Sequence, residues 1–149
     1  MKLIEEFMLL AINEAKRARD ICEVPVGAIV VKGDMVIGTG FNTVIQDQSV
    51  SSHAEINALN SASQALKNYR LTNCDLYVTL EPCHMCAKAI VDARIRNVYF
   101  ATLEPKNGSI VSQDNFFDKE HLNHRVNFSF GAMKEEASDL LTLFFKTKR

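Results

Sequence analysis

Two cysteines, Cys83 and Cys86, stand three residues apart directly after Pro82 and an apolar segment. Proline suits the first turn of a helix, and side chains three apart lie on one helix face, so both thiols can project toward one point. A second helix start begins at His53, and Glu55 follows two residues later. A fold that joins these two starts would collect one imidazole and two thiols. Zinc prefers these ligand types, and three of them leave a fourth tetrahedral position for water.

The rest of the chain alternates between helical and strand patterns. The spacing of apolar residues predicts helices over about 2–20, 52–67, 83–93 and 133–146. Runs of β-branched and aromatic residues bounded by turn residues predict strands over about 24–31, 35–38, 76–80, 97–101 and 126–130. Strands separated by helices favour a three-layer α/β/α sheet with helices on both faces, in which some strands are parallel.

The length and composition suit one globular domain spanning residues 1–149. Of these residues 47% are apolar and 23% charged, and no repeat or linker interrupts the chain. Glu5 and Glu6 break the first apolar run, which therefore indicates an amphipathic helix rather than an export signal, and no later stretch is long enough to span a membrane. We expect a cytoplasmic protein, in which a close cysteine pair serves metal or redox chemistry more often than a structural disulfide.

The charge pattern does not by itself identify a partner. The formal net charge is −1 at pH 7, and the clearest local bias is the C-terminal group Lys146, Lys148 and Arg149. Basic residues at the end of a helix also interact favourably with the helix dipole. The pattern leaves open both a contact with nucleic acid and a solvated helix end.

Each part of the expected metal site also has a simpler interpretation. Glu55 lies three residues after Ser52, as in a capping box that only stabilises a helix start. A Cys-x-x-Cys pair can be half of a structural zinc site or a redox pair. His84, between the cysteines, is a rival ligand, although we expect it to point away from the shared face. Cys22 and Cys74 have no partner at ligand spacing, which predicts core positions for both.

The combination of motifs is more specific than its parts. A His-x-Glu helix start together with a Pro-Cys-x-x-Cys helix start is the known signature of zinc-dependent nucleobase deaminases. In such a site Glu55 takes the proton from a zinc-activated water, and two converging helix N-termini stabilise the thiolates. The signature therefore favours a hydrolytic enzyme over a structural zinc site.

Nearly the whole chain resembles the bacterial tRNA-specific adenosine deaminases of the cytidine deaminase superfamily. The similar segments lie at 23–28, 40–42, 53–55, 68–71, 76–83, 123–126 and 140–149. The segment Asn123-His124-Arg125-Val126 and the basic C-terminal helix are the most diagnostic of the tRNA branch. The resemblance implies a cytidine-deaminase-like fold and hydrolytic deamination of adenosine to inosine at the wobble position of a tRNA anticodon. It also implies a homodimer with one zinc ion per subunit.

The same resemblance implies roles for particular residues. The metal ligands are His53, Cys83 and Cys86, and Glu55 is the proton shuttle. The substrate contacts that it implies, at the target nucleoside or the anticodon loop, are Asn42, Ala54, Lys106, Asn123, His124, Phe144, Phe145 and Arg149. The two phenylalanines also follow Leu140 and Leu141 at helical spacing, a pattern that favours a core position for at least one of them.

Four features depart from the family pattern. Ser49-Val50-Ser51-Ser52 replaces an Asp-Pro-Thr-Ala segment, Glu104 stands in place of aspartate, and Lys88 stands in place of a small residue. The segment 109–113 lacks a second glycine. These changes spare the expected metal ligands but alter loops that the resemblance places near RNA.

The resulting mechanism has water attacking C6 of adenine while Glu55 moves the proton to the ring nitrogen and then to the departing ammonia. An unpaired anticodon loop makes the unstacking of the target base inexpensive. Two alternatives stay open. One is a deaminase of the same fold acting on a free purine or pyrimidine base or nucleoside, such as guanine or cytosine. The other is a non-catalytic zinc-containing RNA-binding module, which does not explain Glu55.

Overall fold

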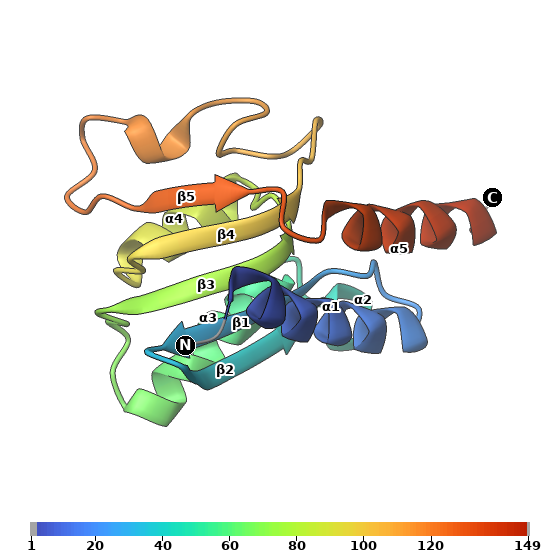
Figure 1. Ribbon diagram of the computed structural model, residues 1–149, viewed down its shortest axis with the longest axis horizontal. Helices are drawn as coiled ribbons and strands as arrows, with labels where there is room; N and C mark the ends of the chain where they lie inside the picture. Colours follow the sequence, from blue (N-terminus) through green and yellow to red (C-terminus); the bar gives the residue numbers. More distant parts are fainter. Residues whose placement is uncertain (1–2, 149) are drawn as a thin grey trace.

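The computed structural model describes residues 3–148, which form a five-stranded sheet with helices around it (Figure 1). The strands are β1 (Gly27–Lys32), β2 (Met35–Phe41), β3 (Cys74–Leu80), β4 (Asn97–Thr102) and β5 (Asn127–Phe130). Their spatial order is β2-β1-β3-β4-β5. Strand β1 pairs antiparallel with β2 and β3, whereas β3, β4 and β5 run parallel. The expectation of a partly parallel sheet is confirmed.

Helices cover both faces of this sheet (Figure 1). On one face α1 (Ile4–Asp20) and α5 (Lys134–Thr147) pack over the strands, and on the other lie α3 (Ala54–Leu66) and α4 (His84–Asp92). This arrangement confirms the predicted three-layer α/β/α architecture. No helix in the described range 3–148 is long and apolar enough to cross a membrane.

Strand β1 shows how the sequence specifies the two-sided core. Ala28 and Val30 belong to the apolar cluster on the α3 and α4 side, whereas Ile29 and Val31 belong to the cluster on the α1 and α5 side. Successive side chains of a strand point to opposite faces, so a strand covered on both sides needs apolar residues at every position. The continuous apolar run in the sequence is therefore the mark of a central strand.

Some local features differ from the predictions. The short helices α2 (Val44–Asp47) and η1 (Phe116–Asp118) were not expected, because one turn is too short to produce a helical period. The predicted core position of Cys22 is wrong: the residue is exposed and adopts a left-handed φ of 63° just after α1 ends. Cys74 is buried at the start of β3, as predicted.

Gly40 provides a test of how closely β2 approaches α3. A Cβ at this position would lie 2.4 Å from the amide nitrogen of Ala58 and 2.5 Å from the carbonyl oxygen of Ala54. Because backbone atoms of a helix cannot move aside cheaply, we expect Gly40→Ala to lower the free energy of unfolding by about 3 kcal/mol, measured by urea denaturation. Gly33→Asn is the control, since the turn at Gly33 is open and asparagine tolerates its positive φ. An unchanged midpoint for Gly40→Ala would contradict the close approach.

Candidate active site

The two helix starts of the predicted metal site meet at one end of the sheet. His53 is the N-cap of α3 and Cys83 is the N-cap of α4, which begins directly after the C-terminal end of β3. Cys83 also forms an isolated bridge with Gly108 in the loop that follows β4. The site therefore lies where the carboxyl ends of two parallel strands, β3 and β4, place their loops beside each other.

The side chains at these helix starts are spaced as metal ligands. His53 Nδ1 lies 3.6 Å from Cys83 Sγ and 3.5 Å from Cys86 Sγ, and the three ligand atoms all lie within 4.8 Å of one another. Tetrahedral zinc, with Zn–S of about 2.3 Å and Zn–N of about 2.0 Å, requires S···N separations of about 3.5 Å. The three residues thus fit a tetrahedral ion of this size and supply three of its four ligands.

The two thiols have opposite electrostatic environments. Hydrogen bonds from Cys86 and, against the effect of burial, from His53 lower the pKa of the Cys83 thiol to about 4. The hydrogen bond to Cys83 together with burial raises the pKa of Cys86. Thiolate charge at the positive N-terminus of α4 is also favoured by the helix dipole. This environment favours the thiolate at Cys83, the form that binds a metal ion, whereas Cys86 would release its proton on metal binding.

Glu55 does not form the capping box that its spacing allows. The backbone N–H of Ser52, the group that such a box would satisfy, donates instead to Ser49, and the helix begins one residue later at His53. The first N–H of α3, that of Ala54, donates to Asn42 Oδ1 at 2.8 Å. Glu55 is only 4% exposed, and burial raises its pKa to about 7. A carboxyl group in this environment can both accept and release a proton near neutral pH.

A cavity of about 1220 Å³ opens above these residues. Its lining residues include His53, Glu55 and Cys83 and also Lys106 and Phe145. Pockets for single small ligands usually enclose about 300–1000 Å³. The cavity therefore has room for more than one nucleoside, with the buried carboxylate of Glu55 in its wall.

Several predicted substrate contacts line this cavity. Asn42, Lys106 and Phe145 are among its lining residues, as is Lys148 near the end of α5. Ala54 is fully buried at the start of α3, and its link to the cavity is the hydrogen bond from its N–H to Asn42. Arg149 lies outside the described residues. The structure thus brings the ends of α3 and α5 and the loop after β4 to one opening.

Asn123 and His124 lie elsewhere. They precede β5, whose first residue Asn127 pairs with Asn97 at the beginning of β4, whereas the cavity lies at the far end of that strand. His124 Nε2 lies 2.7 Å from the carbonyl oxygen of Ile95, so this nitrogen donates to a buried turn. Within one chain these two residues do not reach the cavity, and their contact with RNA stays a prediction.

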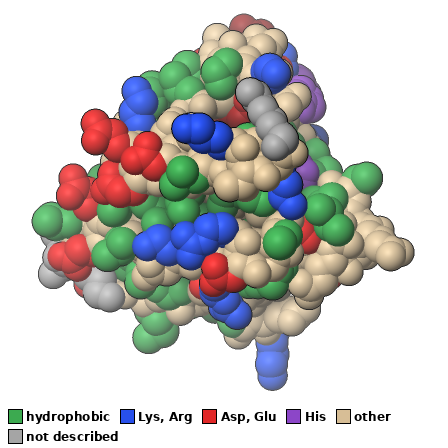
Figure 2. Space-filling view, turned by 90° about the vertical axis from the view of Figure 1, so that its right-hand side faces the viewer, with side chains coloured by type: hydrophobic (Ala, Val, Ile, Leu, Met, Phe, Trp, Pro, Cys, Tyr) green, Lys and Arg blue, Asp and Glu red, His purple; other side chains and the backbone are tan. Residues whose placement is uncertain are grey.

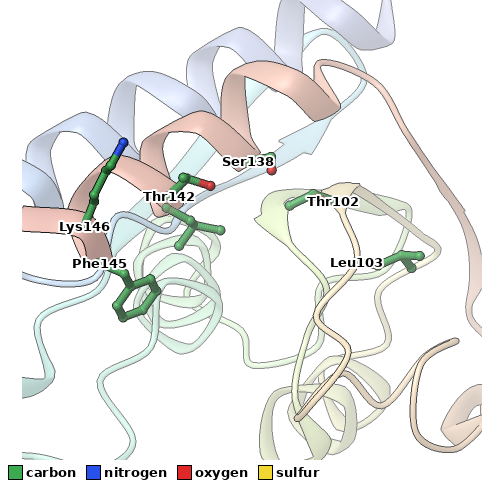
Figure 3. Close-up of a pocket in the computed structure, with 7 residues that line it drawn as sticks. Thr102, Leu103, Ser138, Thr142, Phe145 and Lys146 are labelled. Atoms are coloured by element: carbon green, nitrogen blue, oxygen red, sulfur yellow. The ribbon is translucent and has the colours of Figure 1, made fainter. Parts of the chain in front are cut away.

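The C-terminal phenylalanines do not enter the core. Phe145 is 49% exposed and Phe144 is half-buried, so the core position favoured by their spacing is wrong. The reason is that α5 projects beyond the sheet, so its last turns have no strand beneath them (Figure 1). A smaller hollow of about 490 Å³ lies between α5 and the end of β4, and its lining includes Phe145 and Lys146 from α5 and Thr102 and Leu103 from the end of β4 (Figure 3).

Two of the residues that depart from the family pattern, Glu104 and Lys88, form polar contacts with neighbouring residues. Glu104 Oε1 and Oε2 accept hydrogen bonds from the backbone N–H groups of Lys106 and Asn107, at 3.1 and 2.9 Å. Lys88 pairs with Asp92 at 2.6 Å on the exposed side of α4. The longer carboxylate of Glu104 thus stabilises the turn that presents Lys106 to the cavity.

Two buried glutamates that the sequence did not single out hold the walls of the cavity. Glu23 is 2% exposed and accepts hydrogen bonds from the N–H groups of Ile45 and Gln46. Glu81 is 3% exposed and accepts from the backbone of 104 and of 110–112 and from the Ser112 hydroxyl. Burial raises the pKa of Glu81, but these hydrogen bonds outweigh it and leave the pKa below its usual value. The only feature of the sequence that could have indicated the role of Glu81 is its position between an apolar strand and a proline.

We expect Glu81→Gln to loosen the loop between β4 and η1. Glutamine has one acceptor oxygen, whereas both carboxylate oxygens of Glu81 accept: one from the N–H groups of Ile110, Val111 and Ser112, the other from the N–H of Glu104. In either orientation of the amide, its nitrogen therefore faces at least one buried N–H group. Leaving buried N–H groups unpaired costs about 1–3 kcal/mol each. Faster hydrogen exchange over 104–113 measures the effect, with the exposed substitution Glu120→Gln as control. Parent-like protection in Glu81→Gln would contradict this role.

Charged residues on the face that includes the end of α5 are mixed. Figure 2 shows Lys and Arg side chains as separate groups among apolar and acidic ones, without a continuous basic stripe. Lys148 lies over the ring of Phe144, with its Nζ 5.4 Å from the ring centroid. Positive charge near the cavity is therefore local and combined with aromatic surface.

A family model described as the cytidine and deoxycytidylate deaminase zinc-binding region matches residues 1–102. These residues carry both helix starts and end with β4, so fold and site together define a zinc-binding deaminase domain. A tRNA-specific adenosine deaminase of Aquifex aeolicus (strain VF5) is 46% identical over 145 residues, which cover 97% of this chain and 95% of the relative. The chain belongs to the tRNA-specific adenosine deaminases of this family.

Other relatives agree with this placement. A tRNA-specific adenosine deaminase of Haemophilus influenzae (strain ATCC 51907 / DSM 11121 / KW20 / Rd) is 41% identical, with 97% of this chain and 84% of the relative covered. A solved structure from work on A-to-I editing by tRNA:A34 deaminases at the wobble position of transfer RNA superimposes with a TM-score of 0.89 and 40% identity. The match covers 91% of this chain and 99% of that one.

Proposed function

We propose that this chain deaminates adenosine to inosine at the wobble position of a tRNA anticodon. The observation that carries the proposal is the extent of the similarity. The family model ends at residue 102, but the Aquifex aeolicus relative matches over 97% of the chain, including most of the region that holds β5 and α5. The structure of a guanine deaminase from Bacillus subtilis also covers 95% of this chain, but at 28% identity, so the higher sequence identity of the tRNA-specific relative is what favours a tRNA substrate.

His53, Cys83 and Cys86 would hold one zinc ion per chain. When bound there, zinc supplies a Lewis acid that lowers the pKa of a coordinated water. Glu55 accepts one proton of the attacking water and gives it to the ring nitrogen of adenine. It then takes the proton of the hydroxyl newly formed at C6 and gives it to the departing amine. A pKa of about 7 suits a group that must take and return a proton within one turnover.

Asn42 orients the target base in this proposal. Its Oδ1 is fixed by the N–H of Ala54, so the amide nitrogen is the part of the side chain left for the substrate. Lys106, Phe145, Lys148 and the C-terminal arginine would contact the flanking RNA, with aromatic surface for unstacked bases and positive charge for phosphates. Asn123 and His124 lie away from the cavity of their own chain. They would contact the RNA only if they belonged to a second subunit beside the cavity, or if the RNA extended from the cavity to the other end of β4.

A single domain acting as a cytoplasmic homodimer completes the proposal. A tRNA substrate implies a reaction in the cytoplasm, and the resemblance to the tRNA-specific adenosine deaminases implies a homodimer. Sedimentation equilibrium at micromolar concentration tests the oligomeric state, and a monomer would remove the second-subunit contacts from the proposal.

The near-neutral charge favours a second candidate, a deaminase of free purine or pyrimidine bases or nucleosides. The two functions separate in one experiment. Zinc-loaded protein is incubated with an anticodon stem-loop, with free adenine, guanine and cytosine, and with the corresponding nucleosides, and ammonia release is measured. We expect release from the stem-loop and a change of the wobble adenosine to guanosine on sequencing, because inosine is copied as guanosine. Release from free bases alone would overturn the tRNA assignment.

A further inference from the structure

His84, which separates the two cysteines, belongs to a hydrogen-bonded cluster outside the metal site. Its Nδ1 lies 3.1 Å from Ser109 Oγ and 3.6 Å from Asp114 Oδ2, and its ring meets Phe116 edge-on at a centroid distance of 4.7 Å. Lys119 Nζ lies 3.7 Å from Asp114 Oδ2. Three elements, α4, the loop after β4 and the η1 region, thus hold one imidazole in place.

The hydrogen bonds determine which ring nitrogen carries the proton. Ser109 donates its single hydroxyl proton to Asp114 Oδ1 at 2.6 Å. The Ser109 oxygen must then accept from His84, so Nδ1 of the neutral imidazole is protonated and Nε2 is a bare acceptor. Within residues 3–148 nothing hydrogen-bonds Nε2, and the His84 side chain is 65% exposed.

This oriented acceptor is part of the cavity wall. His84 lines the cavity together with Met85 and the segment 103–107. Glu55 lines the same cavity but, unlike His84, is buried. Cys83 and Cys86 belong to the candidate metal site, whereas His84 is not one of its ligands. An imidazole fixed by Ser109, Asp114 and Phe116 loses little conformational entropy on binding a ligand, which is the property of a preorganised recognition group.

We propose that His84 is a specificity-determining residue that binds a nucleotide next to the target adenosine. The contact rests on the proposed function. Nε2 accepts a hydrogen bond from the RNA, either from a ribose 2′-hydroxyl or from the exocyclic amine of a base. The cavity volume of about 1220 Å³ leaves room for such a neighbour beside the target base. The same contact would discriminate RNA from DNA, or one flanking base from another.

The test combines protein variants with substrate variants under one set of conditions. Anticodon stem-loops carry a single 2′-deoxy substitution, or lack a single exocyclic amine, at each of the nucleotides flanking the target. His84→Phe keeps a ring against Phe116 but removes both nitrogens, and His84→Gln restores a carbonyl oxygen near the position of Nε2. Zinc content and the urea midpoint are measured for each variant.

With the parent protein, one of the substrate changes should lower kcat/KM by about 3- to 10-fold, the usual effect of one lost hydrogen bond. His84→Phe should lower kcat/KM by a similar factor on the unmodified stem-loop and show no further loss on that modified one, whereas His84→Gln should regain part of both effects. Parent-like kcat/KM in His84→Phe, or a substrate effect that persists in it, would overturn the contact alone. A parent protein inactive on every stem-loop would overturn the proposed function and the contact with it.

Discussion

Glu55→Gln is expected to lower the rate of deamination by about 10²- to 10⁴-fold, the usual contribution of a positioned acid–base group. Glutamine keeps the size of the side chain but cannot take a proton from water or return one to the leaving amine. Glu55 is not among the three side chains spaced as ligands, so metal binding should be retained. Single-turnover rates on an anticodon stem-loop, together with the metal content of the same sample, measure both parts of the prediction.

Two further variants make this result interpretable. Glu55→Ala should be as inactive as Glu55→Gln and should also keep its zinc, which shows that the loss does not depend on an introduced amide. His53→Ala should lose both the metal and the activity. A Glu55 variant that is fully loaded with zinc and still deaminates at the parent rate would exclude the proton-shuttle role and reopen the question of which group moves the proton.

The parts of the fold that could be predicted are those with a long periodic pattern. Three elements agree with the predictions to within two residues over the described range: α1 with the helix over 2–20, β3 with the strand 76–80 and β4 with the strand 97–101. The helix buries one face and the strands are buried on both, and each pattern repeats along the sequence. Strand β2 continues to Phe41, three residues beyond its predicted end. Gly38 and Gly40 interrupt the strand signal there, and their role is close contact with α3.

The residues of the candidate site likewise fall into those that the sequence predicts and those that it does not. His53, Cys83 and Cys86 could be combined from the sequence because each lies at a helix start, and zinc chemistry demands few residue types at fixed spacing. Glu81 and Glu23 could not, because their partners are backbone N–H groups 20 or more residues away. Any residue type can supply such a donor, so the sequence carries no mark of the contact. The position of Asn123 and His124 away from the cavity likewise depends on the parallel pairing of β4 and β5.

Cys86→Ser is expected to abolish stoichiometric metal binding and to destabilise the fold. Cys86 is fully buried in the first turn of α4, and its sulfur is one of three ligand atoms that join α4 to the start of α3. A serine hydroxyl is a poor zinc ligand. A ligand present at about a thousand times its Kd stabilises the native state by about 4 kcal/mol, so loss of the site removes an amount of this order.

Cys74→Ser is the matched control for this prediction. Cys74 is as fully buried as Cys86, but its thiol hydrogen-bonds the carbonyl oxygen of Thr72 and takes no part in the metal cluster. Both variants bury a hydroxyl in place of a thiol, and only Cys86→Ser should lose the metal. Adding a chelator should therefore lower the urea midpoint of the parent and of Cys74→Ser but leave that of Cys86→Ser unchanged. A Cys86→Ser protein that still binds one zinc ion per chain and responds to the chelator would show that the ion is held elsewhere.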